Sequence, residues 1–565
     1  MKEKYIALME QVVGAYTREH IDAYTAEVRR RGLWEHGYPR LCSNIGILLA
    51  HGRKQEMREI FPDMMDLCIQ QIPLAKLEDN RAGNDFSVKE VVFCILELEK
   101  AAVFPKEMTE RWRHVLANLD PYKTYYQIAK EEPEPVQNWA SFGAASEQLK
   151  KYAGIADNSA FIERQMQSLL LSFDENGMYV DPDKSAVYDI IPRLQLATTL
   201  HFGYDGKGME ELEKFLLSGV DITLRMQSAA GEIPFGGRSN QFLHNETFFA
   251  AMMEFYASLL HRKGDTARAA MCKRAAGIAT EAILPYLREN PMRHIKNFYA
   301  TDSGYGCEKY AYYDKYMVTA ASWLYLAYVM ADDTIPEAPC PAETGGYICK
   351  TGPLFHKIFM NKGGYSAEIE LEGNTHYDAN GIGKIQKKGA PAFICLSTPF
   401  PSHPFYKLDM DNPSPFSVCG GLLEDDVFHA GYEEGAKYEL IEEKQDEASV
   451  MVRLGCTLLN GAELEESCTV SENGVRVEAQ GKGEVAVFFP VFLFDGQNRT
   501  RIHKEKNCIT VQYRGWKCSY KTDARLIDLD REYANRNGHY KAFAAVCSER
   551  AAVEITIKGD CHVTS

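Results

Sequence analysis

One stretch of the chain, residues 231–245, gathers residue types that could hold an anion. Three glycines and a proline interrupt an otherwise helical pattern there, and helical periodicity resumes at Glu246. The polar side chains of the stretch are Glu232, Arg238, Asn240, Gln241, His244 and Asn245. Paired glycines beside Arg238 let backbone and guanidinium approach a ligand together, and the N–H groups of a helix start favour an anion. The stretch predicts a carboxylate-binding site, and the alternative is an inter-helix turn with incidental polar residues.

An amide and an indole, Asn138 and Trp139, stand side by side before another predicted helix. The pair suits a sugar ring and its carboxylate. The alternative is that Asn138 is a helix cap or a turn residue.

A tyrosine and an ion pair form a third candidate. Asp189 and Arg193 are four residues apart and would pair on one helix face, with Tyr188 alongside. A neighbouring cation favours the phenolate, so the tyrosine proton is easier to remove. A core tyrosine beside a surface ion pair would give the same pattern.

Two more stretches are candidates for binding. Residues 294–316 are rich in tyrosine, including Tyr305 and Tyr310, and contain Lys296, Lys309 and Lys315. They could line a saccharide groove or pack between helices. Residues 373–383 carry His376 and Asp378 among glycines, which fits the edge of a site or a strand-end turn held by Asp378.

Length and charge narrow the function. A chain of 565 residues predicts two or three domains, and its formal net charge of −16 argues against nucleic-acid and membrane partners. An anionic oligosaccharide would therefore need locally gathered cations. The first residues show no signal peptide and no apolar run reaches the ~18 residues of a membrane span, so we expect a cytoplasmic protein.

The fifteen cysteines are scattered singly from Cys42 to Cys561, with no C-x-x-C pair and no metal-ligand spacing. This predicts reduced, mostly buried thiols and no structural zinc. No cofactor is required by the sequence. A divalent metal in the β-domain is left open without a dedicated ligand cage, and so is a homo-oligomer.

The hydrophobic pattern predicts helices over residues 1–335. The helical segments are 8–24, 87–102, 144–153, 160–171, 191–199, 210–227, 246–262, 266–289 and 316–330. They recur as helix pairs at intervals of about 40–60 residues, a rhythm typical of helical hairpins in solenoids and toroids. Because many inner helices are apolar on every face, we predict a closed (α/α) toroid.

Residues 336–346 are proline-rich and predict a linker. Beyond them the pattern switches to period two, which predicts strands at 347–349, 354–360, 367–371, 393–396, 449–454, 464–470, 475–479, 484–489, 508–513 and 551–557. Short strands joined by tight turns predict antiparallel sheets. The predicted architecture is an N-terminal (α/α) toroid of helical hairpins followed by an antiparallel β-sandwich domain over residues 347–565.

With its helical part, proline-rich linker and the sequence His376-Tyr-Asp-Ala-Asn-Gly, the chain resembles the heparinase II/III-like polysaccharide lyases. Members join an (α/α) toroid to a β-sandwich and cleave uronate-containing glycans by β-elimination. Their functional residues run in the order asparagine, tyrosine and sandwich histidine, matched here by Asn138, Tyr188 and His376. Members often carry H-x-H-x-D, whereas Asn374 stands where the first histidine would fall, followed by His376 and Asp378.

The resemblance implies chemistry at C5 of a uronate, whose proton is weakly acidic until the adjacent carboxylate is neutralised. Asn138 and Arg238 would hold that carboxylate by charge-assisted hydrogen bonds. His376 or Tyr188 would remove the proton, and Tyr188 is the expected donor to the leaving oxygen. The residues expected to bind substrate are Trp139, Asp189, Arg193, Asn240, Gln241, His244, Tyr305 and Tyr310, with Arg193 orienting or acidifying the tyrosine.

These observations predict a lyase that acts from the end of short uronate-containing oligosaccharides, since a polymer would not enter a cytoplasm. A glycoside hydrolase on the same toroid is an alternative. It needs two carboxylates about 5–5.5 Å or 6.5–9.5 Å apart, and the candidates are Asp181, Asp189, Glu232 and Glu246. A non-catalytic glycan-binding protein is the other alternative, because fold does not determine function.

Overall fold

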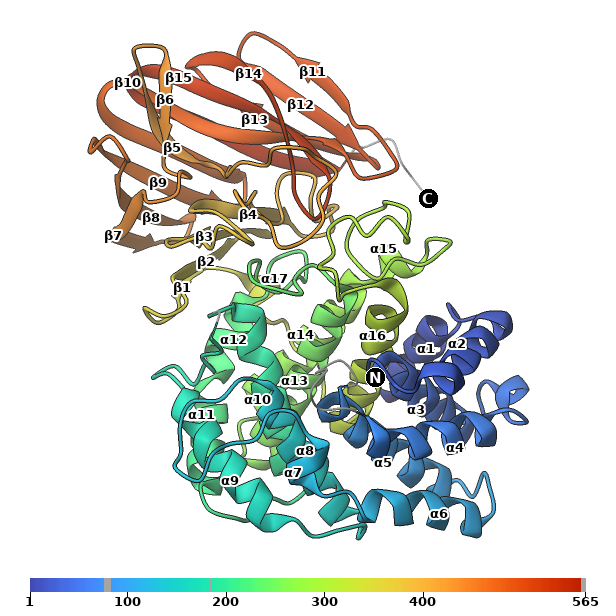
Figure 1. Ribbon diagram of the computed structural model, residues 1–565. Coiled ribbons are helices and arrows are strands. Elements are labelled where there is room, and N and C mark those ends of the chain that lie inside the picture. The colour runs from blue at the N-terminus through green and yellow to red at the C-terminus, as the bar shows by residue number, and fades with distance from the viewer. Residues whose placement is uncertain (76–82, 183, 560–565) are drawn as a thin grey trace.

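The helical part is a closed ring. The computed structural model describes residues 1–75, 83–182 and 184–559, and the helices come first (Figure 1). The ring helices are α3 (Gly37–Ala50), α5 (Asn84–Lys100), α8 (Trp139–Tyr152), α10 (Ala186–His201), α13 (Leu243–Arg262) and α16 (Tyr313–Met330). Each contacts the next along the chain, and α16 returns to α3. The predicted (α/α) toroid is confirmed.

A second layer of helices packs around the ring. It consists of α1 (Lys2–Val13), α2 (Arg18–Arg31), α4 (Phe61–Gln71), α6 (Lys106–Ala117), α9 (Ser159–Leu169), α11 (Met209–Ser218), α12 (Val220–Met226) and α14 (Thr266–Ala282). In ring helix α13 every residue from Leu243 to Leu260 is buried, whereas α2 buries Ile21, Tyr24 and Val28. Ring helices are apolar all round because neighbours cover every face, while outer helices keep one wet face.

Four predicted helical segments differ from the structure. The segment 8–24 is two helices, because the Thr17 side chain accepts a hydrogen bond from the His20 N–H and starts α2 there. Helix α10 begins at Ala186, before its predicted start, so Tyr188 lies in its first turn. The segments 210–227 and 266–289 are also divided, the latter into α14 and α15 (Leu284–Leu287). Within the described residues, no helix is long and apolar enough to cross a bilayer.

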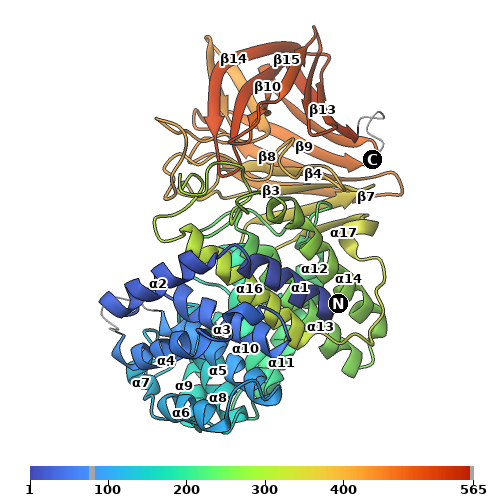
Figure 2. The same cartoon turned by 90° about the vertical axis from the view of Figure 1, so that its right-hand side faces the viewer.

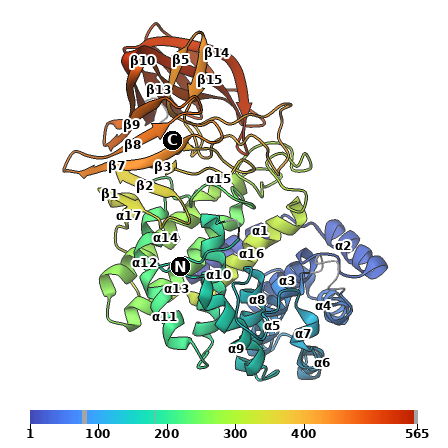
Figure 3. The same cartoon turned by 60° about the vertical axis from the view of Figure 1, so that its left-hand side comes forward.

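The β-domain starts with a small antiparallel sheet of order β1-β2-β3-β4. Its strands are β1 (Tyr347–Lys350), β2 (Lys357–Lys362), β3 (Tyr365–Glu370) and β4 (Gly381–Lys387). Figures 1, 2 and 3 show this sheet between the toroid and the remaining strands. All residues of β3 are buried, because both of its faces are covered. Two further helices, α7 (Pro121–Thr124) and α17 (Pro341–Thr344), are short, and α17 lies inside the predicted linker.

The larger sheet is antiparallel and has the order β11-β12-β13-β15-β10-β9-β8-β7, with β14 on β15, β5 on β10 and β6 on β5. Its strands are β5 (Cys419–Glu424), β6 (Val427–Ala430), β7 (Lys437–Gln445), β8 (Ser449–Thr457), β9 (Glu463–Ser471), β10 (Gly474–Phe494), β11 (Arg501–Lys504), β12 (Cys508–Tyr513), β13 (Trp516–Lys521), β14 (Arg525–Ala534) and β15 (His539–Gly559). Alternate residues of β8 are buried, which turns one face toward the small sheet. The predicted sandwich is confirmed.

Two strand predictions need correction. Residues 393–396 form a turn, in which the Ile394 N–H donates to the Pro391 carbonyl, and Leu396 makes an isolated bridge to Ile385. Pro391 provides no N–H for a ladder, and the apolar run is buried without being a strand. The segments 475–479 and 484–489 are one strand, β10, which continues through an irregularity after Gln480.

The thiols and the acidic side chains bear on the metal predictions. Every cysteine within the described residues is free and most are buried, while Cys561 lies outside those residues. Among the described residues, no group of three or more His, Cys, Asp or Glu side chains has the arrangement of a metal site. A divalent metal in the β-domain therefore remains a prediction for which these residues offer no ligand set.

Buried charges join the toroid to the small sheet. Lys357 of β2 binds Glu368 and Glu370 of β3 at 2.9 and 3.0 Å, and Lys384 of β4 binds Glu368 at 3.0 Å. The backbone N–H of Phe235, in the toroid, also donates to Glu368. Buried charges are tolerated where they are paired and hydrogen-bonded. We call this contact zone, formed by loop 231–245 and the small sheet, the interdomain seam.

Candidate functional site

A cavity of about 630 Å³ opens where the ring helices begin. Its walls come from the N-terminal ends of α3, α5, α8, α10 and α16, and from the loop before α13. The lining residues are Trp34, Glu35, His36, Gly83, Phe86, Trp139, Tyr188, Arg238, Lys309, Tyr310, Tyr312, Lys315 and Tyr316. Helix N-termini carry partial positive charge and unpaired N–H groups, so the ring directs positive potential into this cavity.

Charged side chains add to that potential. Arg238, Lys309 and Lys315 line the cavity, and Glu35 is the one acidic side chain among its described lining residues. Glu35 is buried and accepts a hydrogen bond from the Tyr24 hydroxyl, and burial raises its pKa. The cavity is therefore cationic in a protein whose formal net charge is −16. Such a local reversal of charge is what an anionic ligand requires.

Arg238 lies over the ring of Tyr188. Its guanidinium carbon is 3.6 Å from the ring centroid, and its Nη2 donates to Asp181 Oδ2 at 2.6 Å. The other oxygen of Asp181 accepts from the backbone N–H of Asn138 at 2.9 Å and from its Nδ2 at 3.2 Å. Asp181 thus joins two predicted site residues, Asn138 and Arg238, and a third, Tyr188, lies against Arg238. Arg238, and not Arg193, supplies the cation beside the tyrosine.

The backbone that carries Arg238 is strained. Gly236, Gly237 and Ser239 have φ values of +92°, +80° and +52°. A Cβ on Gly237 would overlap the side chain of Ser185, which directly precedes α10. Positive φ costs a non-glycine residue such as Ser239 about 1–2 kcal/mol. Strain of this kind persists where the surroundings enforce it, and it gathers at functional sites.

Ser239 ties this loop to a wall of tyrosines. Its Oγ is 3.2 Å from the Tyr310 hydroxyl and 3.0 Å from the Tyr316 hydroxyl. The Lys315 ammonium lies 5.8, 6.0 and 5.9 Å from the ring centroids of Tyr310, Tyr312 and Tyr316. Burial raises the pKa of Tyr310 and of Tyr316. These phenols stay protonated at neutral pH and present hydroxyl groups to a ligand.

Flat aromatic rings complete the lining. Phe86 packs edge-on against Trp139 with centroids 4.7 Å apart, and the Arg31 guanidinium lies 3.4 Å from the ring centroid of Trp34. Trp139 was predicted to bind substrate, and it lines the cavity. Aromatic side chains with a few placed polar groups are the usual lining of a small-molecule site.

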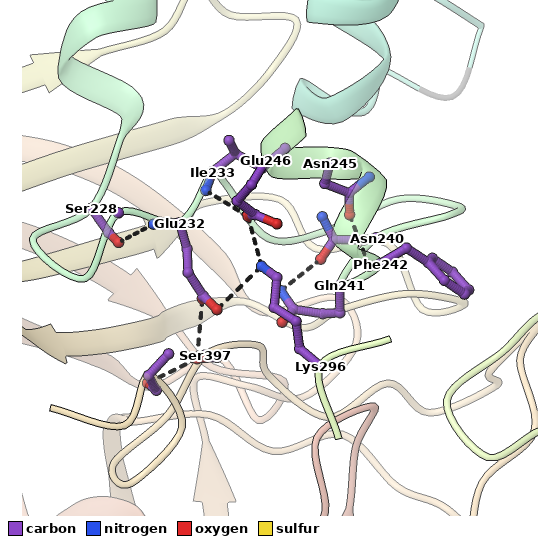
Figure 4. Close-up of polar contacts among 12 residues, drawn as sticks. Ser228, Glu232, Ile233, Asn240, Gln241, Phe242, Asn245, Glu246, Lys296 and Ser397 are labelled. Atoms are coloured by element: carbon purple, nitrogen blue, oxygen red, sulfur yellow. Dashed lines mark hydrogen bonds and ion pairs between the residues drawn. The ribbon is translucent and has the colours of Figure 1, made fainter. Parts of the chain in front are cut away.

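Most polar residues of loop 231–245 lie in the interdomain seam, away from the cavity lining. Lys296 binds Glu246 at 2.7 Å and Glu232 at 3.1 Å, and all three side chains are buried (Figure 4). Glu232 also accepts a hydrogen bond from Gln386 of β4 at 2.6 Å. Burial raises the pKa of Glu246. This group spans toroid and sandwich, which favours a structural role.

Asn240 and Gln241, both predicted to bind substrate, are buried in the same seam. The Asn240 amide donates to the Pro234 carbonyl at 2.9 Å. Gln241 donates to Asn240 at 3.0 Å (Figure 4). The start of α13 is capped by its own first turn, since Asn245 Oδ1 accepts from the backbone N–H of Phe242 at 3.0 Å. Of this loop, Arg238 is the residue that lines the cavity.

The remaining predicted residues of the toroid are held elsewhere. Asp189 and Arg193 form the expected pair, fully buried, and Arg193 reaches the hydroxyls of Thr223 and Tyr256 at 2.9 and 2.8 Å. We expect this pair to fasten α10 to α12 and α13. Burial raises the pKa of Asp189 to about 6.

His244 and Tyr305 are also outside the lining. His244 packs against Tyr316 with ring centroids 5.0 Å apart, and burial lowers its pKa to about 3. It is therefore neutral at physiological pH. Tyr305 lies near the sandwich, with the Lys407 ammonium 4.7 Å from its ring centroid.

His376 belongs to a loop of the sandwich. Its Nδ1 is 2.7 Å from the His403 carbonyl, so Nδ1 carries a proton and Nε2 is the basic nitrogen of the neutral ring. The ring stacks on Phe405 with centroids 3.6 Å apart. His376 is not among the described lining residues, but its loop reaches the toroid where the Asp378 carboxylate lies against Gly236.

One wall of the cavity was missed from the sequence. Trp34, Glu35 and His36 directly precede α3, as Asn138 directly precedes α8. Burial, followed by the charge of Arg40, lowers the pKa of His36, which is neutral at pH 7. The sequence did carry a signal for this wall, because aromatic and basic residues directly precede ring helices that are apolar on every face.

Comparison with known proteins gives similarity at the level of solved structures. No protein-family model and no curated protein matches the chain. A heparan sulfate lyase HepC mutant from Pedobacter heparinus aligns with 10% identity over 93% of this chain and 76% of its own, with a TM-score of 0.49. Chondroitin AC lyase from Streptomyces coelicolor A3 aligns with 10% identity over 99% and 83%, with a TM-score of 0.43. Paenibacillus xanthan lyase aligns with 8% identity over 94% and 53%, with a TM-score of 0.44. Similarity this low assigns no activity or residue role.

Proposed function

We propose that the protein is a lyase that cleaves uronate-containing oligosaccharides by β-elimination. The observation that carries the proposal is the Arg238 guanidinium over Tyr188, 3.6 Å from the ring centroid, inside a cationic cavity. A uronate offers a carboxylate to the cation and an adjacent C5 proton to the tyrosine. The carboxylate would thus meet Arg238 and the C5 proton would meet Tyr188, and these two side chains contact each other.

Binding would begin at the carboxylate. Arg238 would hold it while Nη2 keeps its anchor on Asp181, and the helix N-termini around the cavity would add to the attraction. Neutralising the carboxylate lowers the energy of the carbanion that develops at C5. Preorganised hydrogen-bond donors stabilise such charge most effectively, because they need not move during the reaction.

Proton transfer would then run through Tyr188. As a phenolate it takes the C5 proton, the C4–O4 bond breaks as the C4–C5 double bond forms, and the new phenol returns a proton to O4. Arg238 favours the phenolate that this step needs. Each assisted proton transfer contributes roughly 10²–10⁴-fold to the rate. His376, with Nε2 as its basic nitrogen, stays the second candidate for the base.

The cavity fits an elimination better than a hydrolysis. A glycosidase needs two carboxylates beside the scissile bond, and Glu35 is the single acidic side chain in the described lining. Of the candidate carboxylates, Asp181 binds Asn138 and Arg238, Asp189 binds Arg193, and both glutamates bind Lys296. Each is committed to a structural contact.

We further propose that the substrates are short and are cut from one end. A cavity of about 630 Å³ formed at helix ends is in the range of small-molecule sites. Rates on disaccharides and trisaccharides should equal or exceed those on the parent polymer. A clear preference for polymer would contradict this part of the proposal.

Ultraviolet absorbance tests the reaction directly, because elimination leaves a double bond conjugated to the carboxylate. We expect absorbance to rise when the protein meets its uronate oligosaccharide in a panel of galacturonate, glucuronate and alginate fragments. Tyr188→Phe should reduce the rate by at least about 100-fold, since it removes a proton-transfer group. Arg238→Gln should reduce it too, with weaker binding.

Tyr152→Phe is the matched control, because Tyr152 is an exposed tyrosine at the end of α8. It should keep the wild-type rate. New reducing ends without absorbance would instead indicate a hydrolase. Binding without either product would indicate a glycan-binding protein.

A further inference from the structure

A buried arginine of the sandwich reaches the backbone that presents Arg238. Arg536 lies in the turn between β14 and β15, is 1% exposed, and binds both carboxylate oxygens of Glu308, at 2.7 and 3.2 Å. It also donates to the Gly306 carbonyl and stacks on Tyr406 with its guanidinium carbon 3.9 Å from the ring centroid. Such a guanidinium is held on several sides and has little freedom to move.

Glu308 connects Arg536 to loop 231–245, which carries Arg238. Its Oε1, the oxygen nearer to Arg536, accepts the backbone N–H of Ser239 at 2.7 Å. Ser239 follows Arg238 directly, and its side chain contacts the hydroxyls of Tyr310 and Tyr316. A positive φ at Ser239 is held against its local preference. The hydrogen bond from the Ser239 N–H to Glu308 is one of the contacts that enforce it.

We infer that Arg536 is a positioning residue of the active site: through Glu308 it fixes Ser239 and thereby sets the place of Arg238 over Tyr188. The inference rests on the proposed function. It assigns the sandwich a part in the reaction that does not require any of its side chains to touch the substrate. Positioning matters because a displacement of about 1 Å can cost on the order of 100-fold in rate.

Two measurements test the inference, and the first needs no substrate. Hydrogen exchange of peptides covering residues 236–241 should speed up at least about tenfold in Arg536→Gln, because the Ser239 N–H loses its fixed acceptor. Arg536→Lys keeps the charge but cannot bind both oxygens, so its exchange should lie between wild type and Arg536→Gln. Unchanged exchange in both variants would overturn the inference.

The second measurement is kinetic and uses the uronate fragment that gives the largest absorbance rise. We expect kcat/KM to fall about 100-fold in Arg536→Gln, mainly through kcat, with partial rescue in Arg536→Lys. The matched control is Lys273→Gln, since Lys273 is equally buried and is paired with Glu254 at 2.8 Å. It should lower thermal stability while leaving kcat/KM and the exchange of 236–241 unchanged.

Should Arg536→Gln fold poorly, the double variant Arg536→Gln/Glu308→Gln removes both buried charges while keeping an acceptor for Ser239. We expect the double variant to recover stability more than activity. Two amides bind each other less firmly than a guanidinium binds a carboxylate, so the side chain at position 308 would be held less rigidly. Equal loss of stability and activity in Arg536→Gln and Lys273→Gln would show a merely structural role. A wild-type protein without absorbance change would refute the proposed function, and hydrogen exchange would still decide the role of Arg536.

Discussion

At the scale of single residues, Asp181 divides its two oxygens between two neighbours. Oδ1 accepts both N–H groups of Asn138, and Oδ2 accepts Nη2 of Arg238. The carboxylate is buried, and these partners satisfy both of its oxygens. It thereby fixes the distance between the start of α8 and the loop before α13, and Tyr188 lies beside that junction.

Replacing Asp181 by Asn should disturb both contacts at once. An asparagine has one acceptor oxygen, so its amide must face a donor of either Asn138 or Arg238. We expect the unfolding free energy to fall by about 1–3 kcal/mol, the usual effect of an unsatisfied buried group, and kcat/KM to fall by about 100-fold. Asp205→Asn, at an exposed site, is the control. Equal rates for the two variants would contradict this role.

At the scale of elements, the ring brings different side chains to one cavity because all of its helices have the same orientation. Each ring helix points its N-terminal end, or the segment before it, toward the cavity. Residues far apart in the sequence, such as Trp34, Trp139 and Lys315, therefore share one wall. The loop before α13 is the exception in shape, because it bends back through positive φ values to bring Arg238 inward.

The packing of that loop can be separated from its backbone strain. Gly237 and Gly264 both have φ near +80°, but a Cβ on Gly237 would overlap Ser185, while one on Gly264 meets nothing within 4 Å. Gly264→Ala should cost about 1–2 kcal/mol of unfolding free energy from conformation alone. Gly237→Ala should cost more and should also lower activity. Similar urea midpoints for both variants would show that the loop can relax.

At the scale of the whole molecule, the toroid and the sandwich meet through buried charges. Lys357 with Glu368, Lys296 with Glu232, and Arg536 with Glu308 all lie in or beside this contact. A seam of this kind specifies one relative placement of the two domains, because sliding would leave charges buried and unpaired. Figure 2 shows the two parts stacked end to end, with the small sheet between them.

Stability should depend on pH through buried acids such as Glu466 of β9. Burial raises its pKa from 4.5 to about 7, so between these values the folded protein binds a proton that the unfolded chain has released. Its stabilising contribution is complete below pH 4.5 and is lost as pH rises through about 7, a change of about 3 kcal/mol. The thermal unfolding temperature should therefore fall more steeply between pH 5 and pH 8 in the wild type than in Glu466→Gln. Parallel curves would contradict the assignment.

Much of the fold follows from the sequence pattern, because burial spaces apolar residues differently in helices and in strands. All-round apolar helices predicted a ring with an outer layer, and period two beyond the prolines predicted antiparallel sheets. Where the pattern failed, a local cause overrode it. The Thr17 cap divided one predicted helix, and the turn at residues 393–396 buried an apolar run without making a strand.

The site was within reach of the sequence only in part. The residue types of Asn138, Tyr188 and Arg238 indicated an anion and a proton transfer, because those groups do such chemistry in any fold. Which cation meets the tyrosine was decided by tertiary structure. Spacing along α10 favoured Arg193, but ring closure buries that side chain and brings in Arg238 from a distant loop. Contacts between distant segments depend on how helices pack around a common centre, and no local period encodes them.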